Sequence, residues 1–208
     1  MNIMKNLWTK KEVDFFKKLK NPDGIQKLVS SLSYNTDPVC RSPRYVIKTR
    51  KAHCFDGALF AAAALRQQGY KSLIIDLRAH NDDDHVIAVF KKNGHWGAIA
   101  KSNFTTLQYR EPVYRTLREL VMSYFDFYFN SMGEKTLREY SVPLDLSRFD
   151  KSDWMRTEED ISYIGDYLDG IKHYKIVTPS MIRNLAKTDK KLLKAGLLGS
   201  DPRGLYRP

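Results

Sequence analysis

The spacing of apolar residues divides the chain into helical and extended segments. Apolar residues recur three and four positions apart, the spacing of one helix face, in residues 9–20, 25–32, 54–68, 114–130 and 157–168. Thr9 with Glu12 has the capping-box pattern that begins a helix, and Gly69 stands where a C-cap glycine ends one. The aromatic residues within 114–130 are more typical of a buried core than of a cofactor site.

Extended segments follow the densest helical stretch. Residues 71–79 and 96–100 are strand-like, and residues 85–90 are almost wholly apolar, as expected in a sheet covered on both faces. Asn93-Gly94 is a strong signal for a tight hairpin turn. Residues 139–146 are expected to add a strand. This order predicts an α/β (α+β) fold, with an antiparallel sheet packed against one helix and further helices at its flanks.

The chain is long enough to bury one sizeable core. It has 208 residues, of which 42% are hydrophobic and 12% aromatic, and no internal repeat or low-complexity segment is present. We therefore expect a single α+β domain over residues 1–170, with its core in about residues 44–104. A basic C-terminal extension is expected over residues 171–208.

Positive charge is concentrated in this extension. The formal net charge of the chain is +11, and residues 171–208 hold nine Lys or Arg against two Asp, a net of +7. Such a tail could bind nucleic acid, an anionic membrane or an acidic partner. No RNA- or DNA-binding motif accompanies the charge, which favours a solvated end over a nucleic-acid site. The sequence contains no signal for an oligomeric state.

The apolar runs are too short for a membrane span. None approaches the roughly 20 residues that cross a bilayer. Residues 1–13 alternate basic and apolar residues and lack the continuous apolar region of a secretory signal. These patterns predict a cytoplasmic protein without membrane partners, in which Cys40 and Cys54 stay reduced as free thiols.

Cys54 and His85 are the residues best suited to carry chemistry. Cys54 opens the helix predicted over residues 54–68, where unpaired backbone N–H groups create a positive potential that favours thiolate over thiol. His85 begins the second strand after that helix and could accept the thiol proton. Each residue type alone is commonly structural, and it is the combination that suggests a reactive pair.

Three sequence blocks surround this pair, and together they span about residues 44–104. They are His53-Cys54-Phe55-Asp56-Gly57-Ala58, Asp84-His85-Val86-Ile87-Ala88-Val89 and Gly94-His95-Trp96-Gly97. A helix-borne cysteine, a strand, a histidine on the next strand and a hairpin with a Trp-bearing strand occur in the order that resembles the transglutaminase-like superfamily. The resemblance implies a papain-like fold and a thiol nucleophile that acts on amide or ester carbonyls of peptide or protein substrates.

The third member of a catalytic set is left open by the sequence. The superfamily usually places an Asp, hydrogen-bonded to the His, a few residues after the hairpin Trp, and that position is Ala100 in this chain. If Asn93-Gly94 is a two-residue turn, continued strand pairing brings Ser102 opposite His85. A three-residue loop would present Asn103 instead and give a Cys-His-Asn set.

Three hypotheses about function follow. The first is a cysteine peptidase, amidase or acyl transferase, with Cys54 as nucleophile, His85 as general base and Ser102 or Asn103 as its support. The second is a transglutaminase-like binding module that has lost turnover, which Ala100 favours. The third is a basic accessory protein that acts on nucleic acid through its tail.

Metals and cofactors are not expected. The Cys and His residues have no C-x-x-C or H-x-x-x-H spacing, so no zinc site is predicted, and no cofactor motif is present. The acidic run Asp82-Asp83-Asp84 is interpreted as a solvated loop that could orient His85 or attract a cationic substrate.

Overall fold

The centre of the fold is a seven-stranded antiparallel sheet. The structure of the protein is a computed structural model, which describes residues 8–206. The strand order is β6-β5-β4-β3-β7-β9, and β8 also pairs with β3. The strands are β3 (Leu73–Ala79), β4 (His85–Lys92), β5 (His95–Ile99), β6 (Arg110–Tyr114), β7 (Leu137–Ser141), β8 (Leu144–Asp145) and β9 (His173–Lys175). A separate two-stranded parallel pair joins β1 (Ser33–Tyr34) to β2 (Lys51–Ala52).

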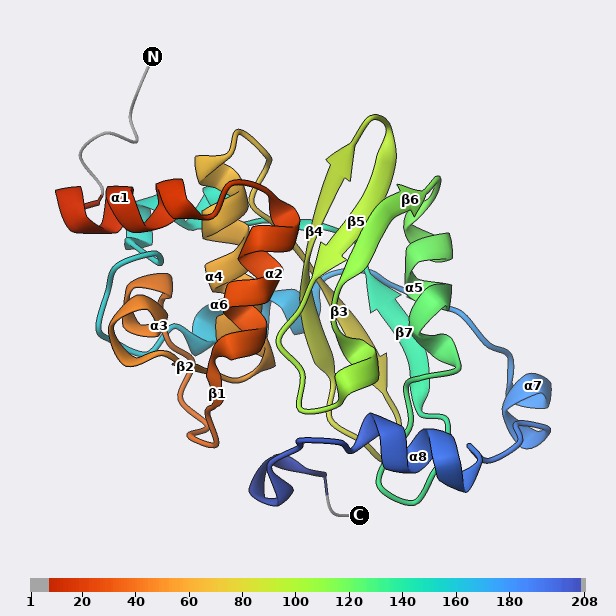
Figure 1. The fold of residues 1–208 in the computed structure, drawn as a ribbon. Coiled ribbons are helices and arrows are strands. Elements are labelled where there is room, and N and C mark those ends of the chain that lie inside the picture. The colour runs from red at the N-terminus through yellow and green to blue at the C-terminus, as the bar shows by residue number, and fades with distance from the viewer. Residues whose placement is uncertain (1–7, 207–208) are drawn as a thin grey trace.

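Helices cover both faces of this sheet (Figure 1). On one face α4 (Cys54–Gln67) lies against β4, with α2 (Pro22–Ser31) and α3 (Pro43–Thr49) packed around it. On the other face lies α5 (Leu117–Phe125). The remaining helices are α1 (Lys10–Lys18), α6 (Ser162–Gly170), α7 (Pro179–Arg183), α8 (Lys190–Gly196) and the 3₁₀ helices η2 (Thr105–Leu107), η3 (Leu146–Ser152) and η4 (Pro202–Gly204). The expected α+β class with an antiparallel sheet is confirmed.

Side chains of β4 divide between two hydrophobic cores. Val86, Ala88 and Phe90 belong to the core under α4, whereas Ile87 and Val89 belong to the core under α5. Because successive side chains of a strand point to opposite faces, a strand covered on both sides must be apolar at nearly every position. The apolar run over residues 85–90 therefore predicted this sandwiched strand correctly.

Helix α4 forms where the sequence predicts it. The His53 side chain caps its first turn by accepting a hydrogen bond from the Phe55 N–H, at 3.2 Å. Gly69, beyond its C-terminus, has a φ of +87°, which a residue with a side chain seldom adopts. The helix is buried from Phe55 to Leu65, and its alanines let it lie close to the sheet.

The hairpin between β4 and β5 has the predicted two-residue turn. Lys92 pairs with His95, and Asn93 and Gly94 both have positive φ, as a type I′ turn requires. The β4–β5 pairing ends at Ala88 opposite Ile99, so it does not continue as far as His85. The chain instead leaves the sheet at Ala100, whose backbone N–H and C=O both bond to the side-chain amide of Gln26.

The helix predicted over residues 114–130 is shorter than expected. Tyr114 ends strand β6, and α5 begins only after Thr116, which forms a capping box with Glu119. The helix ends at Phe125, and the aromatic residues that follow it turn back into the core. Tyr128 and Phe129 are fully buried, as the core interpretation of the aromatic residues predicts.

Other element boundaries also differ from the predictions. The strand expected over residues 139–146 is divided into β7 and β8, since Pro143 between them has no N–H to pair. The helix expected from Thr157 begins at Ser162, where Asp160 accepts a hydrogen bond from the Ser162 N–H. Helix α3 was not predicted from the sequence.

The C-terminal extension is part of the packed structure. Its strand β9 pairs with β7 and widens the sheet. Further along, the Thr188 N–H donates to the Gly133 carbonyl at 2.8 Å, and the hydroxyl of Thr105 donates to the Ala195 carbonyl at 2.7 Å. The boundary expected at residue 171 is therefore not a boundary between sheet and tail. Figure 1 shows the segment continuing along the lower end of the sheet.

The structure tests the expected absence of a membrane span and of a secretory signal only over the residues that it describes. Within residues 8–206, helices are all too short or too polar to cross a bilayer. The segment on which the secretory-signal argument rested, residues 1–13, lies partly outside the described residues.

Phe60 tests the packing under α4. Its side chain is fully buried and stacks on Phe16 at 6.1 Å between ring centroids. Phe60→Ala should lower the free energy of unfolding by about 3–5 kcal/mol, because a large cavity replaces the ring. Phe127, which is 38% exposed, provides the control, and Phe127→Ala should cost about 1 kcal/mol or less. Urea titration measures both, and equal losses would contradict the assignment of Phe60 to the core.

Candidate active site

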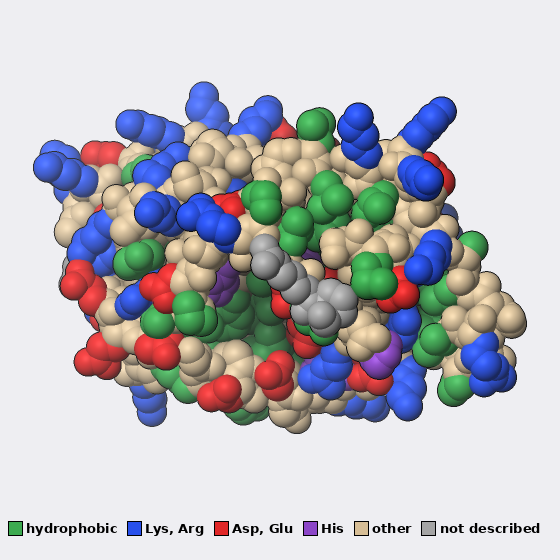
Figure 2. Space-filling model, turned by 90° about the horizontal axis from the view of Figure 1, so that it is seen from below, with side chains coloured by type: hydrophobic (Ala, Val, Ile, Leu, Met, Phe, Trp, Pro, Cys, Tyr) green, Lys and Arg blue, Asp and Glu red, His purple; other side chains and the backbone are tan. Residues whose placement is uncertain are grey.

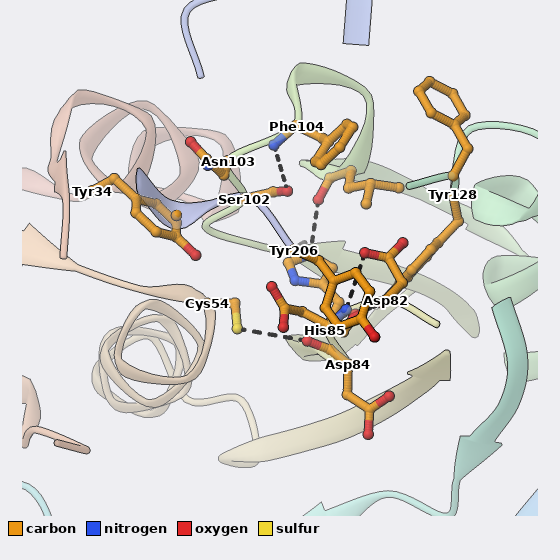
Figure 3. A pocket seen from close by; sticks show the side chains of 14 residues that line it. Tyr34, Cys54, Asp82, Asp84, His85, Ser102, Asn103, Phe104, Tyr128 and Tyr206 are labelled. Carbon is orange, nitrogen blue, oxygen red and sulfur yellow. Dashed lines mark hydrogen bonds between the residues drawn. The ribbon is translucent and has the colours of Figure 1, made fainter. Parts of the chain in front are cut away.

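Cys54 and His85 line one small cavity at the end of the sheet. Its volume is about 50 Å³, room for a few water molecules. Figure 3 shows the two side chains approaching this space from different elements, Cys54 from the start of α4 and His85 from the start of β4. The remaining lining residues are Tyr34, Asp82, Asp83, Asp84, Ser102, Asn103, Phe104, Leu107, Tyr128, Phe129, Gly204 and Tyr206.

The Cys54 sulfur lies against the backbone that carries His85. Its S–H donates to the carbonyl of Asp84 at 3.9 Å, a long and weak hydrogen bond. The N–H of Val86 also approaches the sulfur and lowers its pKa. The sulfur therefore contacts the residues immediately before and after His85 in the chain.

Burial outweighs the helix end in setting the charge of Cys54. The residue keeps a part of its surface accessible, but the protein around the sulfur excludes enough water to raise the pKa of the thiol to about 12. The buried carboxyl of Asp56 in the same helix turn raises it further. The N–H groups of Val86 and Phe55 oppose the shift without reversing it. The thiolate expected from the helix position is thus wrong for this state, in which Cys54 is a neutral thiol.

The His85 ring is held by a backbone carbonyl. Nε2 lies 3.0 Å from the oxygen of Leu107, and because a carbonyl can only accept, Nε2 carries the proton and Nδ1 is the basic nitrogen. The ring also makes an edge contact with Tyr128 at 6.4 Å between centroids. Burial lowers the pKa of His85 to about 4, so the imidazole is neutral at pH 7.

The two side chains come from opposite sides of the sheet. His85 alternates with Val86 and so shares a face with Ile87 and Val89, on the α5 side, whereas Cys54 belongs to the helix on the other side. They reach a common cavity because each is the first residue of its element. Within residues 8–206 no hydrogen bond joins the sulfur to the imidazole in this state.

Ser102 and Asn103 reach the cavity but have other partners. The hydroxyl of Ser102 accepts a hydrogen bond from the Phe104 N–H at 3.0 Å. Asn103 exchanges two hydrogen bonds of 2.8 Å with the backbone of Asp201. Neither residue supports the His85 ring, because the β4–β5 pairing on which that expectation rested ends before His85. The carbonyl of Leu107 occupies the supporting role instead.

The acidic run before His85 is a pinned loop. Asp84 accepts a hydrogen bond from the Ala79 N–H at 2.7 Å, and Asp82 accepts one from the Thr136 hydroxyl at 2.7 Å. The buried hydroxyl of Tyr128 donates to the carbonyl of Asp83 at 2.8 Å. Burial raises the pKa of all three carboxyl groups, that of Asp82 to about 6. The loop therefore orders the wall of the cavity and gives it negative charge at neutral pH.

Several residues of the site had no signal in the sequence. The contribution of Leu107 is a backbone oxygen, which no side-chain pattern reports. Tyr34, Gly204 and Tyr206 come from distant ends of the chain, and only tertiary structure brings them together. Tyr128 was assigned to the core from the sequence, and its ring is indeed buried. Its hydroxyl has a second role, because it holds the acidic loop.

The residues of the cavity do not form a metal site. Across residues 8–206, His, Cys, Asp and Glu side chains nowhere gather in a group of three that could hold an ion. Both Cys40 and Cys54 are free thiols.

Comparison with known proteins gives no assignment. The sequence matches no protein-family model, and no curated protein is detectably similar to it. The arguments for its function therefore rest on the residues and geometry described above.

The pH dependence of alkylation tests the protonation state of Cys54. In a Cys40→Ser background, iodoacetamide should label Cys54 slowly at pH 7, and the rate should rise about tenfold per pH unit through about pH 10, because the pKa is about 12 and only the thiolate reacts. Cys54→Ser is the blank. A rate that levels off below about pH 8 would mean that the thiolate is already favoured in the folded protein.

Asp82 should make stability fall as the pH rises. Burial raises its pKa to about 6, above the roughly 3.9 of an unfolded chain, so between these values the folded protein keeps a proton that the unfolded chain has lost. The free energy of unfolding should therefore decrease from about pH 4 to pH 6. Asp76, whose pKa burial also raises to about 6, adds a slope of the same sign, so Asp82→Asn should reduce the slope without abolishing it. The variant should be more stable than wild type by up to roughly 2–3 kcal/mol above pH 6.

Urea titrations across this pH range measure the effect. Asp14→Asn, which alters an exposed ion pair with Lys17, is the control and should follow the wild-type curve. A variant Asp82→Asn that also follows wild type would show that Asp82 is well solvated.

Proposed function

We propose that this protein is a transglutaminase-like cysteine enzyme that acts on amide or ester carbonyls, with Cys54 as nucleophile and His85 as general base. One observation carries the proposal: a cysteine that begins a helix and a buried, oriented histidine open into the same cavity. The fixed tautomer of the His85 ring supports the proposal further. With Nε2–H committed to Leu107, the other ring nitrogen is the one available to take a proton.

The resting site differs from a thiolate–imidazolium pair. Both groups are neutral, so the thiol must lose its proton as it attacks rather than beforehand. In the proposed step the sulfur forms a bond to the carbonyl carbon, and its proton moves to Nδ1 of His85. Collapse of the tetrahedral intermediate breaks the bond to the leaving amine or alcohol, which takes that proton. Water or an acceptor amine then cleaves the thioester.

Backbone N–H groups at the start of α4 are suited to the developing negative charge. The proposed oxyanion site uses the N–H of Cys54, at the positive end of the helix. This arrangement favours a transition state that carries charge over a ground state that does not.

A binding module without turnover is the second candidate. The small cavity, the neutral thiol and Ala100 in place of the usual acid favour it. The proposal of a basic nucleic-acid accessory protein is weakened, because the basic extension is docked on the fold and the wall next to the cavity is acidic. A cytoplasmic location remains part of the proposal.

Acyl-enzyme formation tests the enzyme proposal. With p-nitrophenyl acetate as the probe, wild type should give an acetyl adduct on Cys54 that is found by peptide mass spectrometry, followed by turnover. Cys54→Ser should lose both, and His85→Ala should slow acylation by about 10²- to 10⁴-fold, the usual size of general-base catalysis.

Matched controls keep this result specific. His95→Ala changes a half-buried ring that bonds to the Asn93 carbonyl in the hairpin turn, away from the cavity, and it should leave the acylation rate unchanged. Cys40→Ser should do the same. Acylation of Cys40 and Cys54 at equal rates, or an unaltered rate in His85→Ala, would sink the enzyme proposal and favour the binding module.

A further inference from the structure

The chain covers its own candidate site with residues 201–206. Gly204 and Tyr206 line the cavity that contains Cys54 and His85, and Figure 3 shows Tyr206 in front of the His85 ring. A larger cleft of about 550 Å³ leads to Cys54 from outside. Residues 34–38 and 203–206 both contribute to its walls. Figure 2 shows the hollow on this face of the molecule, with acidic side chains at its rim.

Specific contacts hold the segment in place. Asn103 exchanges hydrogen bonds of 2.8 Å with the N–H and C=O of Asp201, the pattern by which one strand of backbone recognises another. The Asp201 carboxylate then accepts from the N–H of Arg203 at 3.0 Å and from its guanidinium at 2.7 Å, which shapes the turn η4. An amide that pairs with backbone groups reads the main chain of its ligand and not its side chains.

Glycine is required at one position of this segment. A Cβ on Gly204 would lie 2.4 Å from Cε1 and 2.8 Å from Cδ1 of the Tyr34 ring, and 3.2 Å from Nδ2 of Asn103. The Tyr34 ring would have to move to admit a side chain at position 204. As they stand, Tyr34 and Asn103 form a passage that fits a glycine and no larger residue.

The wall of the cleft beside the segment is acidic. Asp83 and Asp84 line the outer cleft together with Arg203, whose guanidinium pairs with Asp201 of its own segment. Residues 201–206 hold one Asp and one Arg, so the main chain and its glycine, not a net charge, distinguish this segment as a ligand.

We propose that the passage between Tyr34 and Asn103 is a binding site for a peptide turn that carries glycine opposite Tyr34, and that residues 201–206 are its internal ligand. The second half of the idea rests on the proposed function: an external substrate peptide of this kind reaches Cys54 only when the internal segment has left. Binding itself does not depend on any chemistry at Cys54.

Displacing the internal segment gives the first test. Gly204→Ala in the full chain places a methyl group against the Tyr34 ring, so residues 201–206 should leave the groove. In a Cys40→Ser background, iodoacetamide should then label Cys54 at least roughly tenfold faster at pH 8, since the thiol is less buried. Gly170→Ala is the matched control, because nothing lies within 4 Å of its added Cβ. Asp201→Ala, which loses the turn but keeps glycine, should have an intermediate rate.

A peptide added in trans gives the decisive test. A fluorescein-labelled peptide of residues 199–206 should bind the Gly204→Ala chain in an anisotropy titration and slow its labelling at Cys54 to the wild-type rate. The same peptide with alanine at the Gly204 position should bind at least about tenfold more weakly, a difference of 1.4 kcal/mol. Wild-type chain, whose groove is filled, should bind the peptide poorly.

The outcomes separate this proposal from the proposed function. Equal binding of the glycine and alanine peptides, no binding to the Gly204→Ala chain, or labelling of that chain at the wild-type rate would each overturn the peptide site. Glycine-dependent binding without acylation of Cys54 would keep the peptide site and reject the enzyme. Circular dichroism of each variant confirms that it is folded.

Discussion

The burial of helix α4 sets the geometry of the candidate site. Ten consecutive positions after Phe55 are buried, so the helix is locked in all directions and its first residue, Cys54, has a fixed place at the end of the sheet. Gly57 allows the segment around Lys101 to cross close to the helix, because a Cβ on Gly57 would lie 2.4 Å from the Cβ of Lys101. That crossing brings Ser102 and Asn103 beside Cys54 and continues into the turn whose carbonyl holds His85.

Two opposing effects act on the Cys54 thiol, and their sizes decide the outcome. A helix N-terminus stabilises a negative charge by about 0.3–1 kcal/mol when exposed, and up to about 2 kcal/mol when partly buried. Removing a charged group from water shifts its pKa by up to 3–5 units, which corresponds to a larger free energy. Burial has the larger effect on the pKa of Cys54, and the same burial lowers the pKa of His85 so that its ring is neutral. Any movement that admits water would shift both groups back toward an ion pair.

The acidic loop and the basic C-terminal extension belong to the same feature of the molecule. Backbone and hydroxyl contacts hold residues 82–84 at the wall of the cavity, while the extension adds an edge strand to the sheet and then crosses the mouth of the cleft. The extension is packed on the sheet before it reaches Cys54, so these earlier contacts, and not Cys54 itself, position the part that covers the site. This explains how a charged tail, which composition alone suggests to be solvated, becomes part of the site.

Local patterns in the sequence were sufficient to determine much of this protein. Periodicity gave α4, the apolar strand β4 and the class of fold, and Asn93-Gly94 determined the hairpin register, because each depends on residues close together in the chain. The same patterns selected Cys54 and His85. They failed for the helix over 114–130, where a capping box inside the stretch and a strand before it were stronger than the aromatic periodicity.

Only the tertiary structure decided the support and the protonation of the pair. The partner of His85 is the backbone oxygen of Leu107, a group that every residue type carries and that the sequence therefore does not mark. Sequence reasoning chose the side chains of residues 102 and 103 instead, and these bond elsewhere. The pKa of Cys54 depends on how much protein surrounds it, a property of packing between distant segments and not of its place in a helix. Residues that are near in sequence set the elements, and residues that are far apart set the dielectric, the hydrogen-bond partners and the access to the site.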